Sequence, residues 1–217
     1  MEKKIPVKEG SKIVGIVRLK QYRAGTFDRA FPVIERIKKL EAFAVEFPHK
    51  YAGDVARRLT ILRDELAKVM EGGYIGLALE QKNLVMQGNL TGKDLLIQYL
   101  MGNMATGGTH ATLNGGINYG ALGTGSATPL ITDTQLGAET NRTTVTYSQD
   151  LGYNEALIQF FFPDSVLANA TYNEGGTFVN GTASANTGAL FNHVLFTSPY
   201  VKTSGVDTTF EVDITLT

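Results

Sequence analysis

The sequence predicts an α+β protein in which an antiparallel β-sandwich, of jelly-roll or Ig-like type, carries an inserted antiparallel α-helical hairpin. Two observations indicate this class. Apolar residues recur every three or four positions between residues 27 and 70, which is helical spacing. Beyond residue 102 the chain shows short apolar runs separated by Thr-, Asn- and Gly-rich turns without intervening helices, which is typical of sandwiches. With 217 residues, 43% of them hydrophobic, the chain can bury a sizeable core.

The chain begins with a predicted strand over residues 12–23, followed by a turn at 24–26. From Phe27 the helical spacing starts, and Pro32 should lie in the first turn of that helix or mark a kink in it. A second helix is expected from about Asp54, and Gly72 and Gly73 should end it.

The two helices are expected to pack against each other as an antiparallel pair, which brings the ends of the helical segment together. If the strand before them pairs with the strand after them, the helices are an insertion in a hairpin loop. The predicted division is therefore a sandwich domain formed by residues 1–26 and 73–217, with a helical arm over residues 27–72.

After the helices the period returns to two, and a short helix is expected at 93–101. The predicted strands cover residues 74–79, 84–86, 118–122, 143–147, 156–162, 190–196 and 208–216.

The net charge of −1 divides unevenly along the chain. Residues 1–72 have 16 Lys/Arg and 10 Asp/Glu, a net of +6, whereas residues 73–217 have 4 and 11, a net of −7. This division predicts a basic helical arm on an acidic sandwich, and head-to-tail contacts between copies that salt would weaken. The chain has no cysteine, which excludes disulfides, thiolate metal sites and cysteine nucleophiles.

No pattern in the sequence points to catalysis, a cofactor or a metal. His49, His110 and His193 lack ligand partners at diagnostic spacing, so we expect surface or packing roles for them. The glycine-rich residues 120–125 lack the lysine and following helix of a phosphate loop, and a structural turn is expected there. The acidic residues Asp133, Glu139, Asp150 and Asp164 are expected on surface loops rather than paired for glycoside cleavage.

Two sets of residues are candidates for assembly contacts. On the outer face of the second helix, cations alternate with acids and lack an aromatic platform, so an acidic protein surface is a better partner than nucleic acid. Those cations are Arg57, Arg58, Arg63 and Lys68. The second set is Asp133, Glu139 and Arg142. For Glu139 and Arg142 the alternative is an intramolecular salt bridge that fixes a turn.

An ordered series of phrases runs along the second part of the chain: Lys82–Val85, Gly92–Leu96, Leu100–Gly102, Tyr119–Gly125, Thr128–Pro129, Thr132–Leu136 with Glu139 and Arg142, Asn173–Phe178, Gly188–Phe191, Phe196–Lys202 and Thr209–Leu216. This series resembles a domain common in tailed-bacteriophage virion proteins. The resemblance covers roughly residues 74–217 and departs at Gly176–Thr177, where the pattern usually has a bulky apolar residue. It implies a structural domain and no catalytic residues.

The resulting expectation is a non-enzymatic structural component of a tailed-phage virion, assembled in the host cytoplasm as a homo-oligomer with other virion proteins in a tail, baseplate or fibre-anchoring position. No apolar run is long enough to cross a membrane. The alternatives are a capsid decoration or cement protein, and a carbohydrate-binding module using exposed aromatics. Candidate aromatics are Tyr119, Tyr153, Tyr172 and Tyr200. A glycan depolymerase is a third hypothesis and requires two carboxylates in one cleft.

Overall fold

The computed structural model describes residues 13–46, 52–85, 116–152 and 155–216 and confirms the predicted α+β class. All strand pairings are antiparallel. The elements are β1 (Ile13–Arg23), α1 (Thr26–Glu46), α2 (Ala52–Gly73), β2 (Tyr74–Val85), β3 (Ile117–Gly123), β4 (Glu139–Thr144), β5 (Tyr147–Gly152), β6 (Glu155–Phe162), β7 (Thr171–Val179), β8 (Ala189–Val201) and β9 (Val206–Leu216).

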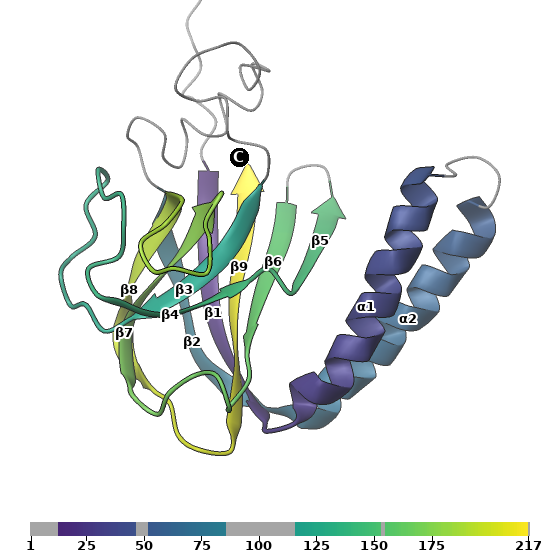
Figure 1. Ribbon diagram of the computed structural model, residues 1–217, viewed down its shortest axis with the longest axis horizontal. Coiled ribbons are helices and arrows are strands. Elements are labelled where there is room, and N and C mark those ends of the chain that lie inside the picture. Colours follow the sequence, from purple (N-terminus) through teal and green to yellow (C-terminus); the bar gives the residue numbers. More distant parts are fainter. Residues whose placement is uncertain (1–12, 47–51, 86–115, 153–154, 217) are drawn as a thin grey trace, which may run out of the picture.

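Two sheets form the sandwich (Figure 1). One has the strand order β2-β1-β9-β6-β5 and the other β4-β3-β7-β8. They are joined at one edge because the end of β2 leaves β1 and pairs with β8 at Leu84 and Val85. At the opposite edge, Val145 N donates to Asn118 O at 3.0 Å and Thr146 N donates to Gln159 O at 2.9 Å. The chain between β4 and β5 therefore crosses from one sheet to the other.

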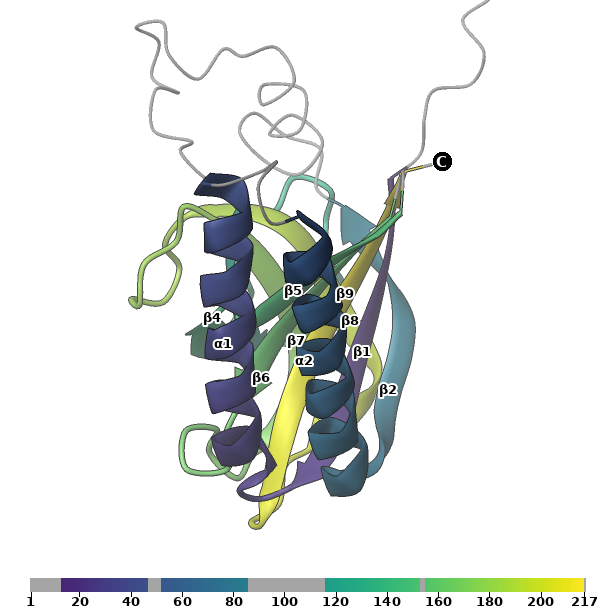
Figure 2. The same cartoon turned by 90° about the vertical axis from the view of Figure 1, so that its right-hand side faces the viewer.

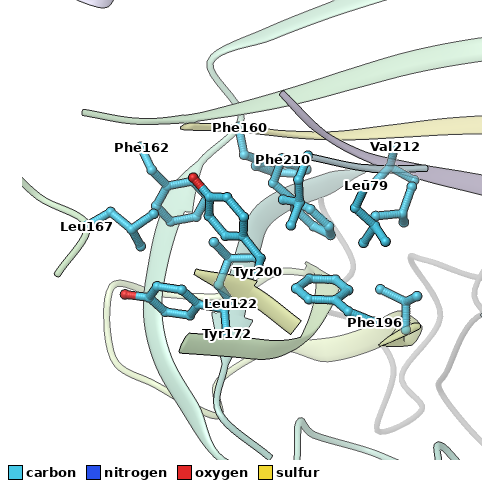
Figure 3. Close-up of a cluster of buried hydrophobic side chains, with 13 residues drawn as sticks. Leu79, Leu122, Phe160, Phe162, Leu167, Tyr172, Phe196, Tyr200, Phe210 and Val212 are labelled. Carbon is cyan, nitrogen blue, oxygen red and sulfur yellow. The ribbon is translucent and has the colours of Figure 1, made fainter. Parts of the chain in front are cut away.

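The core lies between the sheets and is rich in aromatic side chains (Figure 3). Phe160, Phe162 and Phe210 are completely buried there. Tyr172 and Tyr200 are also core residues, with exposed fractions of 0% and 4%, and their hydroxyl groups form hydrogen bonds inside the protein. Neither tyrosine is therefore available to a carbohydrate at the surface.

Along the chain, the two helices connect two strands that pair with each other, as predicted. Strands β1 and β2 pair from Gly15↔Asn83 to Tyr22↔Tyr74, and the helical hairpin connects the ends of that pair. It stands beside the outer face of the sheet that contains β1, β9, β6 and β5 (Figures 1 and 2). It is more closely attached than an arm, because its first turns share a hydrophobic cluster with Tyr22 and Phe161 of that sheet.

No helix of the described residues is long and apolar enough to span a membrane.

Strand β7 is the element that the sequence did not predict. Gly175 and Gly176 suggest a turn, yet β7 pairs with both β3 and β8 in the middle of its sheet. A Cβ on Gly176 would lie 2.6 Å from a backbone oxygen of β8, so the glycine permits close packing. The expected turn at 120–125 is similarly corrected, since residues up to Gly123 belong to β3.

Two other expectations need comment. The strand predicted at 143–147 is two strands, with the crossing between the sheets in its middle. The helix predicted at 93–101 lies outside the described residues.

Candidate functional site: the helical hairpin and the loop between β3 and β4

The base of the hairpin is fixed by a carboxylate from β9. Asp207 is buried, and its Oδ2 accepts a hydrogen bond from Phe27 N at 3.2 Å. A negative charge at a helix N-terminus is favourable because the first backbone N–H groups lack helical partners. The ring of Phe27 stacks on Phe161 of β6, with centroids 4.4 Å apart. These contacts set the direction in which the hairpin leaves the sandwich.

Further along, ion pairs join the two helices. Arg36 of α1 donates to both carboxylate oxygens of Glu65 of α2, at 3.0 and 3.1 Å. Arg63 of α2 donates to Glu41 of α1 at 3.0 Å. Burial raises the pKa of the Tyr147 phenol on β5, and Arg63 and Glu41 also act on it, so this second pair faces the sheet.

A groove of about 540 Å³ opens between the helices. Its floor includes Leu40, Phe43 and Ile61, and its cations are Arg36, Lys39 and Arg58. Ile61 is 57% exposed, which is high for a large apolar side chain on a helix. Phe43 and Ile61 are two positions away from Glu41 and Arg63, and residues two apart point to nearly opposite sides of a helix. The groove therefore faces away from β5.

The four predicted contact residues of α2 lie in different environments. Arg57 and Arg58 are exposed beside Asp54, at 3.2 and 3.9 Å. Lys68 is exposed as well. Arg63 instead belongs to the pair that faces β5. Among these four cations, only Arg58 lines the groove, where it joins Arg36 and Lys39, two residues that the sequence had not singled out.

The other predicted pair is internal. Arg142 donates to both carboxylate oxygens of Glu139, at 2.5 and 2.8 Å, and the two side chains are only 4% and 1% exposed. The guanidinium also lies over the rings of Tyr119 and Phe178 and donates to Thr187. These contacts match the intramolecular alternative for Glu139 and Arg142. Such a buried, stacked arginine fixes local structure rather than offering a free charge at the surface.

A buried histidine links the third predicted contact residue to the sandwich. His193 of β8 is 3% exposed, and its ring nitrogens lie 3.0 Å from Asp133 Oδ2 and 2.8 Å from Glu174 Oε2. Both ring nitrogens therefore lie within hydrogen-bond distance of a carboxylate. Burial alone would raise the pKa of Glu174, but hydrogen bonds from His193, Ala138 N and Gly137 N outweigh it and lower the pKa to about 2.

This network holds the loop between β3 and β4, residues 124–138. Glu174 accepts hydrogen bonds from backbone N–H groups at both ends of the loop, including Gly125 N at 3.1 Å and Gly137 N at 3.0 Å. Asp133 accepts a further one from Leu130 N at 2.9 Å. The loop is thereby fixed while Leu130 and Ile131 remain 63% and 39% exposed. These two side chains form the Leu130–Ile131 projection, an exposed apolar surface on a hydrogen-bonded loop.

Part of the uneven charge of the sequence is neutralised within the protein. Arg18 of β1 contacts Glu80 of β2 at 2.7 Å and Glu211 of β9 at 3.2 Å. Lys20 of β1 contacts Glu211 at 2.7 Å. The basic N-terminal strand thus lies between two acidic partners. Glu139, Glu174 and Asp207 also have internal partners, so much of the negative surplus never reaches the surface.

The predicted basic arm is corrected accordingly. Residues 27–72 have nine Lys/Arg and eight Asp/Glu, a net of only +1, while residues 1–26 have seven Lys/Arg and two Asp/Glu. The positive surplus therefore lies in residues 1–26, and of their described cations Arg18 and Lys20 pair with β2 and β9.

No group of three or more His, Cys, Asp or Glu in the described part of the chain is placed to hold a metal ion. Comparison with protein-family models, with curated proteins and with solved structures finds no match to this chain. Two exposed apolar surfaces lie on the elements described above: the hairpin groove and the Leu130–Ile131 projection.

Proposed function

We propose that this protein is a non-enzymatic structural component of a tailed-phage virion, which assembles with itself and with neighbouring virion proteins. The sequence phrases that resemble phage virion domains support this proposal. Several of them meet in the folded chain, because the strand of Tyr119–Gly125 pairs with that of Asn173–Phe178, which also pairs with that of Gly188–Phe191. The resemblance thus concerns a connected part of the scaffold rather than scattered matches.

The observation that carries the proposal is the exposed groove of the hairpin. An isolated soluble domain gains nothing from leaving Ile61 in water beside Leu40 and Phe43, whereas an assembly component buries such a surface against its neighbour. The Leu130–Ile131 projection supplies a second surface at a different place on the molecule. Two different surfaces permit contacts that repeat through a ring or lattice.

Mass spectrometry of purified particles of the phage that encodes this chain tests the proposal. The chain is expected as a stoichiometric component, and its absence from washed particles would contradict the assignment. Density-gradient separation of tails from tailless heads then distinguishes the two structural positions. Recovery with tails supports a tail, baseplate or fibre-anchoring position, whereas recovery with heads supports the alternative of a capsid decoration protein.

A further inference from the structure

The groove between α1 and α2 also indicates the kind of partner that fits it. We propose that it receives an acidic amphipathic helix of a neighbouring virion protein. This inference rests on the proposed function and specifies the chemistry of one of its contacts.

The spacing of the lining residues favours a helix as the occupant. On α1 the groove is lined at positions 36, 39, 40 and 43, and on α2 at 58, 61 and 62. Both series follow the helical three-and-four pattern and run along neighbouring antiparallel helices. A groove of this kind is where a third helix packs in a helical bundle, with its own apolar stripe in contact with the floor.

The charges of the groove favour acidic flanks on that helix. Three cations line the groove. Among them, Arg36 forms a close ion pair, with Glu65 at 3.0 Å. Arg58 lies 3.9 Å from Asp54, a carboxylate that Arg57 approaches more closely. Lys39 forms none of the ion pairs recorded between described residues. Carboxylates on either side of an apolar stripe would meet Lys39 and Arg58 as the stripe covers Ile61.

A second copy of the chain is a poorer occupant. Two grooves facing each other across a twofold axis would bring Lys39 and Arg58 close to the same cations of the other copy. Three acidic residues of the sandwich, Glu139, Glu174 and Glu211, are already paired inside the protein and do not compensate this repulsion. The partner chemistry therefore points to another chain.

Binding of designed peptides to the purified full-length protein tests the inference. The probe is a fluorescent helix of about 18 residues, or about five turns, with leucines at helical spacing flanked by glutamates. A second peptide has lysine at every glutamate position. We expect the acidic peptide to bind at least tenfold more tightly than the basic one, with affinity that falls as salt rises. Equal affinities, or no binding of the acidic peptide, would overturn the inference.

Paired variants locate the binding on the groove. Ile61→Asp is expected to lower the affinity for the acidic peptide at least tenfold. Thr60→Asp, at the neighbouring exposed position, should leave that affinity unchanged. Lys39→Glu with Arg58→Glu should reverse the preference in favour of the basic peptide. The matched control is Lys38→Glu with Arg57→Glu, one position away on each helix, which should preserve the preference. Since all these side chains are exposed, circular dichroism should show unchanged folding.

Two other occupants would contradict the proposal. Concentration-dependent dimerisation in analytical ultracentrifugation, abolished by Ile61→Asp, would assign the groove to a second copy. Co-sedimentation with phosphatidylglycerol vesicles, abolished by the same substitution, would assign it to an anionic membrane. If the peptides do not bind, the chain can still be a virion component. If the chain is absent from virions, the peptide result still holds. The two proposals therefore fail separately.

Discussion

Replacing Glu174 by glutamine removes the charge at the centre of the loop network with almost no change of shape. The carboxylate accepts hydrogen bonds from Gly125, Gly137, Ala138 and His193. A glutamine side chain has one acceptor oxygen, and its amide group would meet an N–H donor at the other position. Hydrogen bonds to charged groups contribute about 1.5–3 kcal/mol each. The loss of two of them predicts that Glu174→Gln lowers the free energy of unfolding at pH 7 by about 3–6 kcal/mol.

The pH dependence gives a second measure of the same interaction. The network lowers the pKa of Glu174 from 4.5 to about 2, and a pKa unit corresponds to about 1.4 kcal/mol. A carboxylate with a lowered folded pKa stabilises the fold fully above its unfolded pKa. That contribution, about 3 kcal/mol, should therefore be lost as the pH falls from about 4.5 to about 2. The Gln variant has no such group at this position, so its unfolding free energy should fall less over the same range.

Urea unfolding followed by tyrosine fluorescence, repeated from pH 7 to pH 2.5, measures both quantities. Glu80→Gln is the matched control, because Glu80 is half exposed and its pair with Arg18 should contribute at most about 1 kcal/mol. If the difference between wild type and Glu174→Gln is the same at pH 7 and pH 2.5, the charge of Glu174 does not hold the loop, and the interpretation of the network is wrong.

Three further substitutions test the packing around the site. Phe161→Ala removes the buried ring beneath Phe27 and should cost about 3–5 kcal/mol in chemical unfolding, with faster hydrogen exchange at the start of α1. Gly120→Ala places a Cβ 2.4 Å from a phenylalanine ring of β6 and should lower the free energy of unfolding by about 1–3 kcal/mol. Gly76→Ala is its control, because a Cβ there meets nothing within 4 Å and should change that free energy by less than about 0.5 kcal/mol. Asp207→Ala removes the acceptor at the N-terminus of α1 and should lower the unfolding free energy by about 1–2 kcal/mol, and an unchanged value would exclude the capping role.

The helices and most strands were predictable because their signals are local. The three-and-four spacing from Phe27 onward depends only on which residues face the neighbouring helix and the sheet, and β1 and β6 show continuous apolar runs. Strand β7 was missed for the opposite reason. Gly175 and Gly176 adopt a strand because Phe210 and β8 pack closely against them, and that proximity is a property of the folded protein.

The candidate site was predictable only in part. Arg58 was identified because exposed cations on a helix can be recognised from helical spacing, whereas Arg36 and Lys39 come beside it only through the packing of α1 on α2. The network around Glu174 gave no sequence signal, since its histidine and its second carboxylate lie 19 and 41 residues away along the chain. Buried ionic groups of this kind are brought together by tertiary folding. The residues involved show no regular spacing in the sequence, so a single sequence does not reveal them.

The charge division illustrates the difference between a chain and its surface. A net of +6 followed by −7 suggests two bodies that attract each other, yet antiparallel pairing lays the basic strand β1 between β2 and the acidic strand β9. Opposite charges distant in sequence then neutralise each other in one sheet, as Arg18 does with Glu80 and Glu211. An interface driven by overall charge loses its basis. Recognition instead depends on local features that remain at the surface after folding, such as the cations and apolar side chains of the hairpin groove.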